Sequence, residues 1–130
     1  MTNETEEQVL DAAAALVAAF AAHDTAGYFD AFAPDASFVF YTTPDRLESR
    51  AAYERLWGEW ERDAGFRVQG CVSRNRRVQV HGTAAIFVHD VETRVEMDAV
   101  VTTVLERETI VFERRAGRWI AVHEHLSPQP

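Results

Sequence analysis

Positively charged residues are scarce in this sequence. It contains no lysine, and 13 arginines face 21 aspartates and glutamates, which gives a formal net charge of -8. A protein that binds nucleic acid or an anionic membrane needs a basic face. The composition therefore argues against both kinds of partner, and we attribute the missing lysine to the codon composition of a GC-rich bacterial genome rather than to function.

Cysteine and long apolar runs are also scarce. Cys71 is the single cysteine, so no intramolecular disulfide can form, which favours a reducing cytoplasm. The longest apolar run, Ala12–Ala22, is too short to span a bilayer, and the acidic start of the chain differs from the basic start of a signal peptide. With no repeat or linker either, the 130 residues predict one cytoplasmic domain, residues 1–130.

Helical periodicity is confined to the first half of the chain. Apolar residues recur at helical spacing over Val9–Phe20, and Thr5 and Gln8 have the spacing of a capping box at the start of this first helix. A second, shorter helix is predicted over Thr25–Ala33. We expect Pro34 to stop it, because the residue before a proline avoids the α region.

A third helix is predicted from Ser49 to about Asp63, with Gly65 closing it. Its apolar face carries four large side chains at spacings i, i+3, i+4 and i+7. These are Tyr53, Leu56, Trp57 and Trp60. The two tryptophans either pack on a sheet or form the rim of a pocket, and the sequence leaves both interpretations open.

Strand-like segments fill most of the remaining chain. Ser37–Thr42 has the composition of a strand, and Phe66–Val72 and Arg77–His81 predict one long, bent strand. Ala84–Val91 and Val100–Glu113 follow. This order predicts an α+β fold, with helices segregated to one side of a curved antiparallel sheet.

The final stretch predicts a β-hairpin in which Gly117 takes the positive φ of a tight turn. Because strand side chains alternate, the second arm points two sets of side chains to opposite faces. One set is Trp119, Ala121, His123 and His125. The other set is Ile120, Val122, Glu124 and Leu126. Both sets are largely apolar, so we expect a core on one side and a helix or a second subunit on the other.

Two stretches resemble signatures of the NTF2-like, or SnoaL-like, superfamily: residues 107–127 (RETIVFERRAGRWIAVHEHLS) and residues 32–38 (FAPDASF). The ending V-H-x-H-x-S is similar to that of the association, or hub, domain of calcium/calmodulin-dependent kinase II and its bacterial relatives. The resemblance implies a cone of three N-terminal helices packed in a curved antiparallel β-sheet around a pocket, with dimerisation through the outer face of the sheet. It implies no single activity, because this fold hosts isomerases, dehydratases, cyclases, hydrolases, transport adaptors and assembly domains.

The chemistry of the superfamily can be compared with the residues present. Steroid isomerisation requires a carboxylate base, and aligning residues 35–37 with the isomerase motif puts Phe40 at the position of the base, where a phenyl ring cannot accept a proton. Dehydratase- or cyclase-like chemistry requires a His–Asp pair that faces the pocket. His89 and Asp90 are adjacent on a predicted strand and face opposite sides, so His89 needs a carboxylate from a neighbouring strand, which the sequence does not identify.

His123 and His125 lie two residues apart on one predicted strand. Such a pair can chelate a metal ion with a third ligand, but no other ligand is suitably spaced, so we expect neither a metal nor another cofactor. The register that the kinase-hub resemblance implies places both histidines on the outer face, where we expect a dimer interface that also includes Trp119. The same register points Glu124 and Leu126 into the pocket.

A carboxylate that points into an apolar cone needs a partner or a raised pKa. Glu124 could form a structural salt bridge with Arg94, Arg107 or Arg114, or it could serve as a catalytic acid. The sequence leaves both interpretations open.

Two hypotheses follow. The first is a pocket protein, catalytic or not, that binds or transforms a small apolar or weakly polar organic molecule, with Glu124 and His89 as the acid–base residues. The residues expected to contact that ligand are Tyr28, Phe40, Trp57, Trp60, Ile110, Phe112 and Leu126. The second is a non-catalytic oligomerisation domain like the kinase hub, which uses the sheet face with His123 and His125. Both include a homodimer through the sheet face, and neither includes nucleic acid or a membrane.

Overall fold

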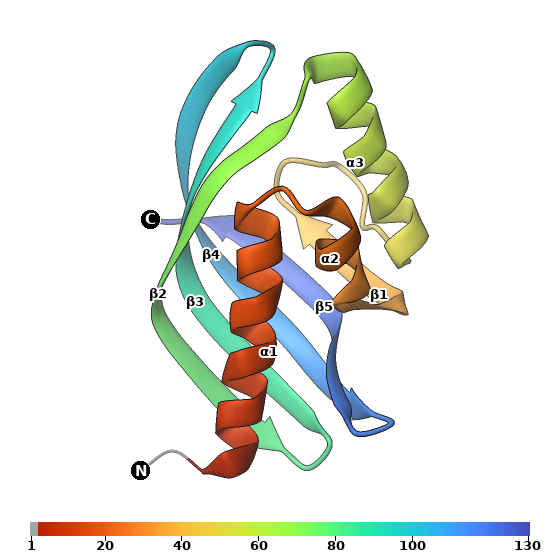
Figure 1. Ribbon diagram of the computed structural model, residues 1–130, viewed down its shortest axis with the longest axis vertical. Helices are drawn as coiled ribbons and strands as arrows, with labels where there is room; N and C mark the ends of the chain where they lie inside the picture. Colours follow the sequence, from red (N-terminus) through yellow and green to blue (C-terminus); the bar gives the residue numbers. More distant parts are fainter. Residues whose placement is uncertain (1–2) are drawn as a thin grey trace.

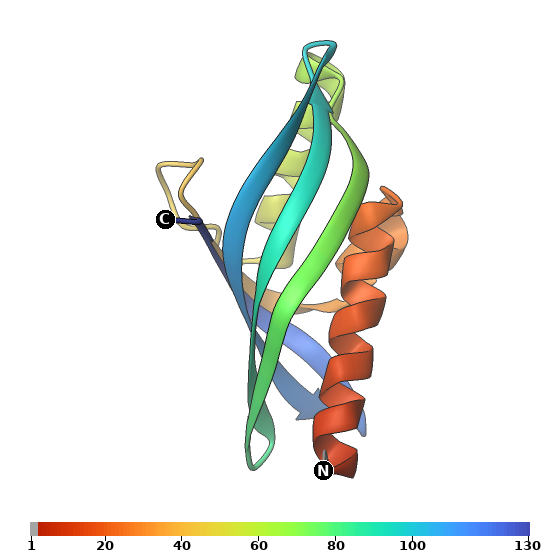
Figure 2. The same cartoon turned by 90° about the vertical axis from the view of Figure 1, so that its left-hand side faces the viewer.

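Three helices lie on one side of a curved five-stranded sheet in the computed structural model, which describes residues 3–130 (Figure 1). The helices are α1 (Glu4–Ala21), α2 (Thr25–Asp30) and α3 (Arg50–Ala64). The strands are β1 (Phe32–Phe40), β2 (Arg67–His81), β3 (Ala84–Met97), β4 (Val100–Arg115) and β5 (Arg118–Pro128). This architecture confirms the predicted α+β cone. Figure 2 shows the long strands bending around the side that carries the helices.

The strands are ordered β1-β5-β4-β3-β2 in the sheet. Strands β2 to β5 pair antiparallel as predicted, whereas β1 pairs parallel to β5 at the edge. Strand β1 begins at Phe32, so the prediction of a helix through Ala33 is wrong. Phe32 is fully buried and pairs with Ala121, and this burial favours the extended backbone two residues before Pro34.

The helix ends test the capping predictions. Helix α3 begins after Ser49, whose hydroxyl accepts from the Ala52 N–H (3.1 Å), and it ends at Gly65 with φ of 63°, as predicted. The capping box predicted at Thr5 is wrong. Asn3 caps α1 instead, because its side-chain oxygen accepts from the Glu6 N–H at 2.8 Å.

A β-bulge in β5 decides which side chains face the helices. Val111 of β4 pairs with His123, and the next residue, Phe112, pairs with Ala121, so Val122 is left without a partner in the ladder. Strict alternation therefore fails at Val122. The prediction that Trp119 shares a face with His123 is wrong, because the bulge puts Trp119 and Ala121 on the inner, concave face.

The inner face of the sheet and the helices enclose the hydrophobic core. Its largest fully buried side chains include Trp57, Tyr28, Phe32, Phe38, Phe87 and Phe112. No helix of the described chain covers the outer face of the sheet (Figure 2). Within residues 3–130, no helix is both long and apolar enough to cross a membrane.

Candidate functional site

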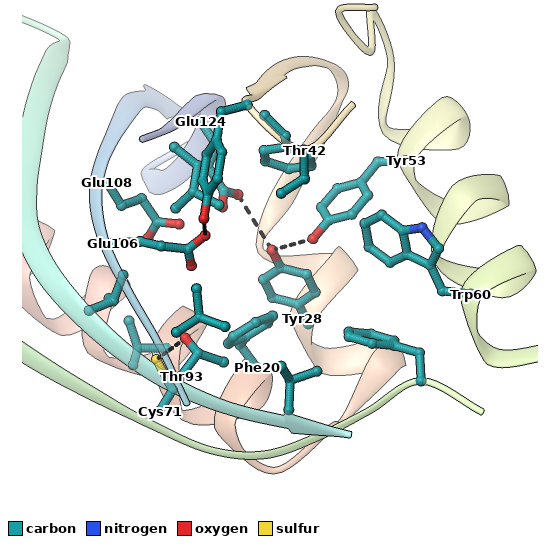
Figure 3. A pocket seen from close by; sticks show the side chains of 18 of the residues that line it. Phe20, Tyr28, Thr42, Tyr53, Trp60, Cys71, Thr93, Glu106, Glu108 and Glu124 are labelled. Carbon is teal, nitrogen blue, oxygen red and sulfur yellow. Dashed lines mark hydrogen bonds between the residues drawn. The ribbon is translucent and has the colours of Figure 1, made fainter. Parts of the chain in front are cut away.

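A cavity of about 420 Å³ lies between the inner face of the sheet and helices α1 and α3 (Figure 3). Its wall is largely apolar and aromatic, and every strand and helix contributes to it. The acidic groups in the wall are Glu106 and Glu108 of β4 and Glu124 of β5. Three carboxyl groups in one apolar cavity form an arrangement that needs partners or protons.

Glu124 owes its position to the bulge at Val122. It pairs with Ile110 across the ladder, so it points inward, and its side chain is almost wholly enclosed, with the residue only 4% exposed. Tyr28 Oη donates to its Oε2 at 3.4 Å, and its carboxyl group also shares a hydrogen bond with that of Glu108. Burial raises the pKa of Glu124 well above its usual range, and the negative charge of Glu108 raises it further.

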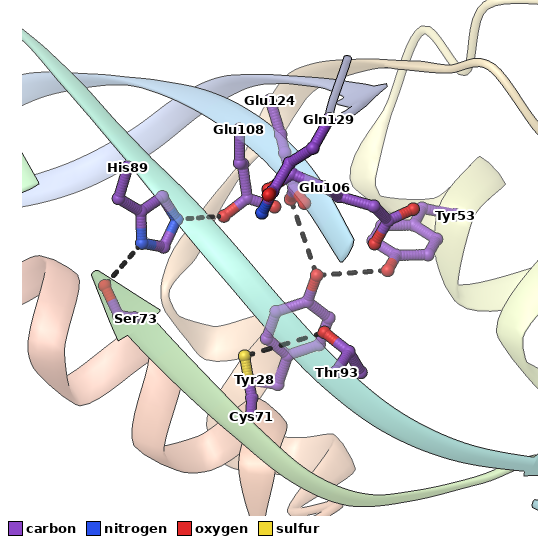
Figure 4. Close-up of polar contacts among 10 residues, drawn as sticks. All are labelled: Tyr28, Tyr53, Cys71, Ser73, His89, Thr93, Glu106, Glu108, Glu124 and Gln129. Carbon is purple, nitrogen blue, oxygen red and sulfur yellow. Dashed lines mark hydrogen bonds and ion pairs between the residues drawn. The ribbon is translucent and has the colours of Figure 1, made fainter. Parts of the chain in front are cut away.

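Glu108 holds the negative charge of this carboxyl pair. Burial alone would raise the pKa of Glu108, but hydrogen bonds from Glu124 and His89, together with the charge of His89, outweigh it and lower that pKa. The contact with His89 is short, at 2.7 Å from Nε2 to Oε1, and His89 Nδ1 lies 2.6 Å from Ser73 Oγ (Figure 4). Since an ionised carboxylate only accepts, Nε2 donates to Glu108.

Two buried tyrosines continue this hydrogen-bonded chain toward α3. Tyr28 Oη lies 3.0 Å from Tyr53 Oη, and the two hydroxyls point toward each other beside Glu124 (Figures 3 and 4). Burial raises the pKa of both tyrosines well above the usual range, and the charge of Glu124 adds to the shift. Both are therefore neutral hydrogen-bond donors.

Glu106 is the third carboxyl of the cavity. Tyr41 Oη donates to its Oε2 at 2.6 Å. Burial raises the pKa of Glu106, although the bond from Tyr41 opposes the shift. The pKa of Tyr41 rises to about 12, mainly through burial and then through its contact with Glu106. Burial also raises the pKa of Cys71 in the same wall to about 11, so this thiol is not a reactive nucleophile at neutral pH.

The structure divides the predicted ligand-contacting residues into two groups. Tyr28, Phe40, Trp60 and Leu126 line the cavity. The other three belong to the packed core and do not line the cavity: Trp57, Ile110 and Phe112. Trp57 is turned toward α2, where its Nε1 donates to Thr25 Oγ1 at 3.2 Å, so of the two tryptophans only Trp60 reaches the cavity.

Of the two predicted acid–base residues, only one lines the cavity. Glu124 lines the cavity, whereas His89 is buried behind the wall and contacts the cavity through Glu108. No salt bridge joins Glu124 to an arginine in the described chain. The Arg107 side chain lies on the outer face, with its Nε 3.7 Å from Asp90 Oδ1.

Sequence reasoning missed Glu106 and Glu108. A signal was present, because both lie an even number of residues before the buried Ile110 on one predicted strand and so share its face. Thr93 was missed as well, and its position depends on the register between β3 and β4, in which Thr93 pairs with Val104.

His123 and His125 lie on the outer face, and Trp119 does not. His123 Nδ1 lies 2.8 Å from Ser37 Oγ, and the two imidazole centroids are 6.4 Å apart. Trp119 is buried in the core, and its Nε1 donates to Gln8 Oε1 at 3.3 Å. In the part of the chain that the structure describes, no three His, Cys, Asp or Glu side chains are grouped closely enough to hold a metal ion.

The cavity can therefore supply a proton and accept one at adjacent positions. Burial and the charge of Glu108 raise the pKa of Glu124, whereas hydrogen bonds from Glu124 and His89 lower that of Glu108, so Glu124 is the member of the pair that keeps its proton to higher pH. Tyr28 and Tyr53 orient the acid. Such a pair of carboxyl groups, whose pKa values are driven apart by their surroundings, is typical of acid–base sites.

Comparisons with known proteins agree with this fold. A family described as the SnoaL-like domain matches residues 9–130 of the chain. No curated protein gives a significant match. Among solved structures, an NTF2-like protein from Cytophaga hutchinsonii superposes with a TM-score of 0.81 at 12% identity, covering 98% of this chain and 100% of that one.

Two further structures carry more specific descriptions. A ketosteroid isomerase-like protein from Erwinia carotovora atroseptica has a TM-score of 0.81 at 20% identity, covering 99% of this chain and 100% of the other. The kinase II hub homology domain from Chlamydomonas reinhardtii has a TM-score of 0.75 at 19% identity, covering 98% and 100%. At these identities the likeness shows the shared fold and leaves the activity open.

Proposed function

The chain belongs to the SnoaL-like family, and we propose that it binds a small, largely apolar organic molecule inside the cone and transforms it by acid–base chemistry. The observation that carries this proposal is the carboxyl pair of Glu124 and Glu108 in the wall of an apolar cavity. A volume of about 420 Å³ suits a small organic ligand. The enzyme is proposed to work in the cytoplasm, in keeping with its single cysteine.

The two carboxyl groups have distinct proposed roles. Glu124 donates its proton to the ligand, and Glu108 accepts a proton from it, so the charge of the pair is restored in each turnover. His89 does not line the cavity, so we propose that it acts through Glu108. By donating Nε2–H to that carboxylate (2.7 Å), it keeps the negative charge on Glu108 and therefore the proton on Glu124.

Binding in the cavity can be tested without knowing the natural ligand. Nile red is a neutral, apolar dye whose fluorescence rises in an apolar site. We expect the wild type to bind it, and the variant Thr93→Phe, which fills the cavity, to lose binding. Val72→Phe places the same ring on the outer face and is the matched control. Equal dye binding by Thr93→Phe and the wild type would exclude the cavity as the site.

The acid–base assignment has its own test. Carboxyl carbon NMR of the wild type, with Glu124→Gln to assign the signal, should show Glu124 titrating well above the reference value of about 4.3. A Glu124 carboxyl that titrates at or below that value would remove the proposed acid.

The outer face supports a second candidate function, a non-catalytic oligomerisation domain. Val72, Val101 and Leu105 are exposed there, and solvent-exposed apolar side chains on one face favour a protein partner. We propose that the partner is a second copy of the chain, bound through the sheet face with His123 and His125. A sedimentation measurement that finds a monomer at micromolar concentration would exclude this arrangement.

A further inference from the structure

We infer that the molecule bound in the cone is an amine: an organic cation whose apolar or aromatic body fills the cavity and whose ammonium group meets the carboxyl groups. The inference rests on the proposed binding function and adds the chemical class of the ligand. Three features of the cavity lead to it: the hydrogen-bond donors of its wall, the charges of its wall and its aromatic rings.

The tyrosine hydroxyls of the wall have already donated their protons to other protein atoms. Tyr41 Oη donates to Glu106 (2.6 Å), and Tyr28 Oη donates to Glu124 (3.4 Å). Since Tyr28 has a single hydroxyl proton, the 3.0 Å contact between the two tyrosines requires that Tyr53 donates to Tyr28. The proton of Glu124 lies in its bond with Glu108. The hydroxyl groups therefore have no second proton to offer a ligand, and the Glu124 proton reaches a ligand only when its bond with Glu108 breaks.

Thr93 gives the same result independently. It lines the cavity and is only 7% exposed, and it donates to Cys71 Sγ at 3.7 Å (Figure 3). Among the described residues the Cys71 thiol is its one hydrogen-bond partner, so Thr93 Oγ1 keeps a lone pair that can accept from a ligand. The wall's other polar side chains with protons to offer are the exposed Thr42, the Trp60 indole and the weakly donating Cys71 thiol. The buried polar surface thus consists mainly of acceptors, and a matching ligand must supply the donors.

The charges of the wall favour a cationic ligand over a neutral or anionic one. Three carboxyl groups line the cavity, and no arginine or histidine of the described residues does. A carboxylate or phosphate ligand would lie against negative charge with no compensating cation. An ammonium group carries three donors and a positive charge, so it can form charge-assisted hydrogen bonds with Glu106 and Glu124.

The apolar part of the wall suits the same cation. Phe20, Phe40, Trp60 and Phe66 present aromatic rings to the cavity. An aromatic face attracts a cation electrostatically, and more strongly where water is excluded. These rings also bury the carbon skeleton of the ligand, which contributes the larger part of the affinity.

Binding of an ammonium ion is coupled to proton release. The raised pKa of Glu124 favours its protonated form before a ligand binds, and the groups that face it are Glu106 and Glu108 from β4, Tyr28 from α2 and Tyr53 from α3. The tyrosines stay neutral, so a bound cation is compensated by ionisation of a carboxyl group. We expect up to one proton to be released for each amine bound near neutral pH, and only the molecules in which Glu124 keeps its proton hold the acid of the proposed reaction.

The test uses matched ligands that differ only in their polar group. Phenethylamine, phenethyl alcohol and phenylacetate are titrated into the wild type by calorimetry, together with the corresponding cyclohexyl and naphthyl compounds. Repeating the titrations in buffers with different ionisation enthalpies counts the protons released. We expect the amine of each set to bind at least about tenfold more tightly than the alcohol, the factor that one charge-assisted hydrogen bond supplies, and the carboxylate to bind most weakly.

Two variants connect the result to the cavity. Glu124→Gln should lose the preference for the amine and the proton release, whereas Glu92→Gln, which removes a carboxylate from the outer face of β3, should leave both unchanged. If the amines bind no better than the alcohols, the inference is overturned but the proposed pocket stands. The same conclusion follows if the dye binds and none of these compounds does. If neither the dye nor any compound binds, the proposed function itself fails.

Discussion

The two faces of β3 and β4 carry similar charged groups but hold them differently. On the inner face, His89 Nε2 lies 2.7 Å from Glu108 Oε1, and the imidazole is wholly enclosed. On the outer face, the next residues along the same strands, Asp90 and Arg107, are 3.7 Å apart, and Arg107 is 59% exposed. Both pairs join directly opposed residues of one ladder. The surroundings, rather than the identity of the charges, therefore decide how strongly each pair is bound.

This difference explains why the proposed acid–base site lies on the inner face. In the cavity a charge has few alternative partners, so the Glu108 charge is fixed by His89 and the Glu124 proton is fixed by Glu108. On the outer face, water replaces any lost partner, and ion pairs there contribute little. The following predictions test this comparison.

The largest effect is expected from truncating adjacent residues on opposite faces. His89→Ala leaves Glu108 buried without its donor, and breaking such a pair costs about 3–5 kcal/mol of unfolding free energy. Asp90→Ala breaks the outer pair and should cost no more than about 1 kcal/mol. Urea denaturation of both variants gives the two values. Similar losses of unfolding free energy in the two variants would show that burial does not determine the strength of these ion pairs.

The outer face should instead control assembly. Leu105 is 50% exposed on that face, on β4, where it pairs with Glu92 of β3. Leu105→Asp should weaken the proposed dimer about a hundredfold, because an apolar residue of the proposed interface is replaced by a charge. Analytical ultracentrifugation over a concentration series measures the change. Ala51→Asp, on the exposed side of α3, adds the same charge elsewhere and should leave the dimer intact. Unchanged assembly of Leu105→Asp would place the interface on another surface.

The inner face should also control how stability depends on pH. An unfolded chain loses the Glu124 proton above about pH 4.3, whereas the folded protein keeps it because its pKa is raised. The folded state then binds more protons than the unfolded state. The stability that Glu124 contributes is therefore complete below the pKa of the unfolded chain and is lost as the pH rises through the pKa of the folded protein. One such proton gives a slope of up to about 1.4 kcal/mol per pH unit.

Glu124→Gln should remove this slope between mildly acidic and alkaline pH while keeping a donor for Glu108. Urea denaturation at a series of pH values measures it, with Glu92→Gln as the variant that should retain the wild-type slope. Glu108 acts in the opposite direction, because its lowered pKa makes its contribution disappear on acidification instead. A Glu124→Gln protein with the wild-type slope would mean that Glu124 is ionised in the folded state.

The same comparison shows what could be predicted from the sequence. The family resemblance predicts the inner position of Glu124. Simple alternation along the strand puts Glu124 on the face opposite Trp119, which is buried on the inner face, and so predicts the outer face. The bulge at Val122 has no glycine to mark it, and it is visible only in the register between β4 and β5. Helix α3, by contrast, was bounded correctly because Ser49 and Gly65 act locally.

The partner of His89 could not be identified because it depends on a long-range register. That register is set by the turn between β3 and β4, where Asp98 and Ala99 both take positive φ without a glycine. A residue-by-residue scan for turn signals misses such a turn. The carboxyl groups on β4 were accessible to reasoning, because Glu106 and Glu108 share the parity of the buried Ile110.

The smallest effect is expected within the cavity wall, where enclosure again separates two similar contacts. Tyr28→Phe removes the hydroxyl that donates to Glu124 and accepts from Tyr53, and both partners are buried, so it should cost about 1 kcal/mol. Tyr41→Phe removes the shorter bond, 2.6 Å to Glu106, yet Tyr41 is 46% exposed. Water can replace its hydroxyl, so the cost should stay below about 0.5 kcal/mol. Urea denaturation of the two variants at neutral pH measures both costs. A larger loss for Tyr41→Phe would mean that bond length, rather than enclosure, sets the strength of these contacts.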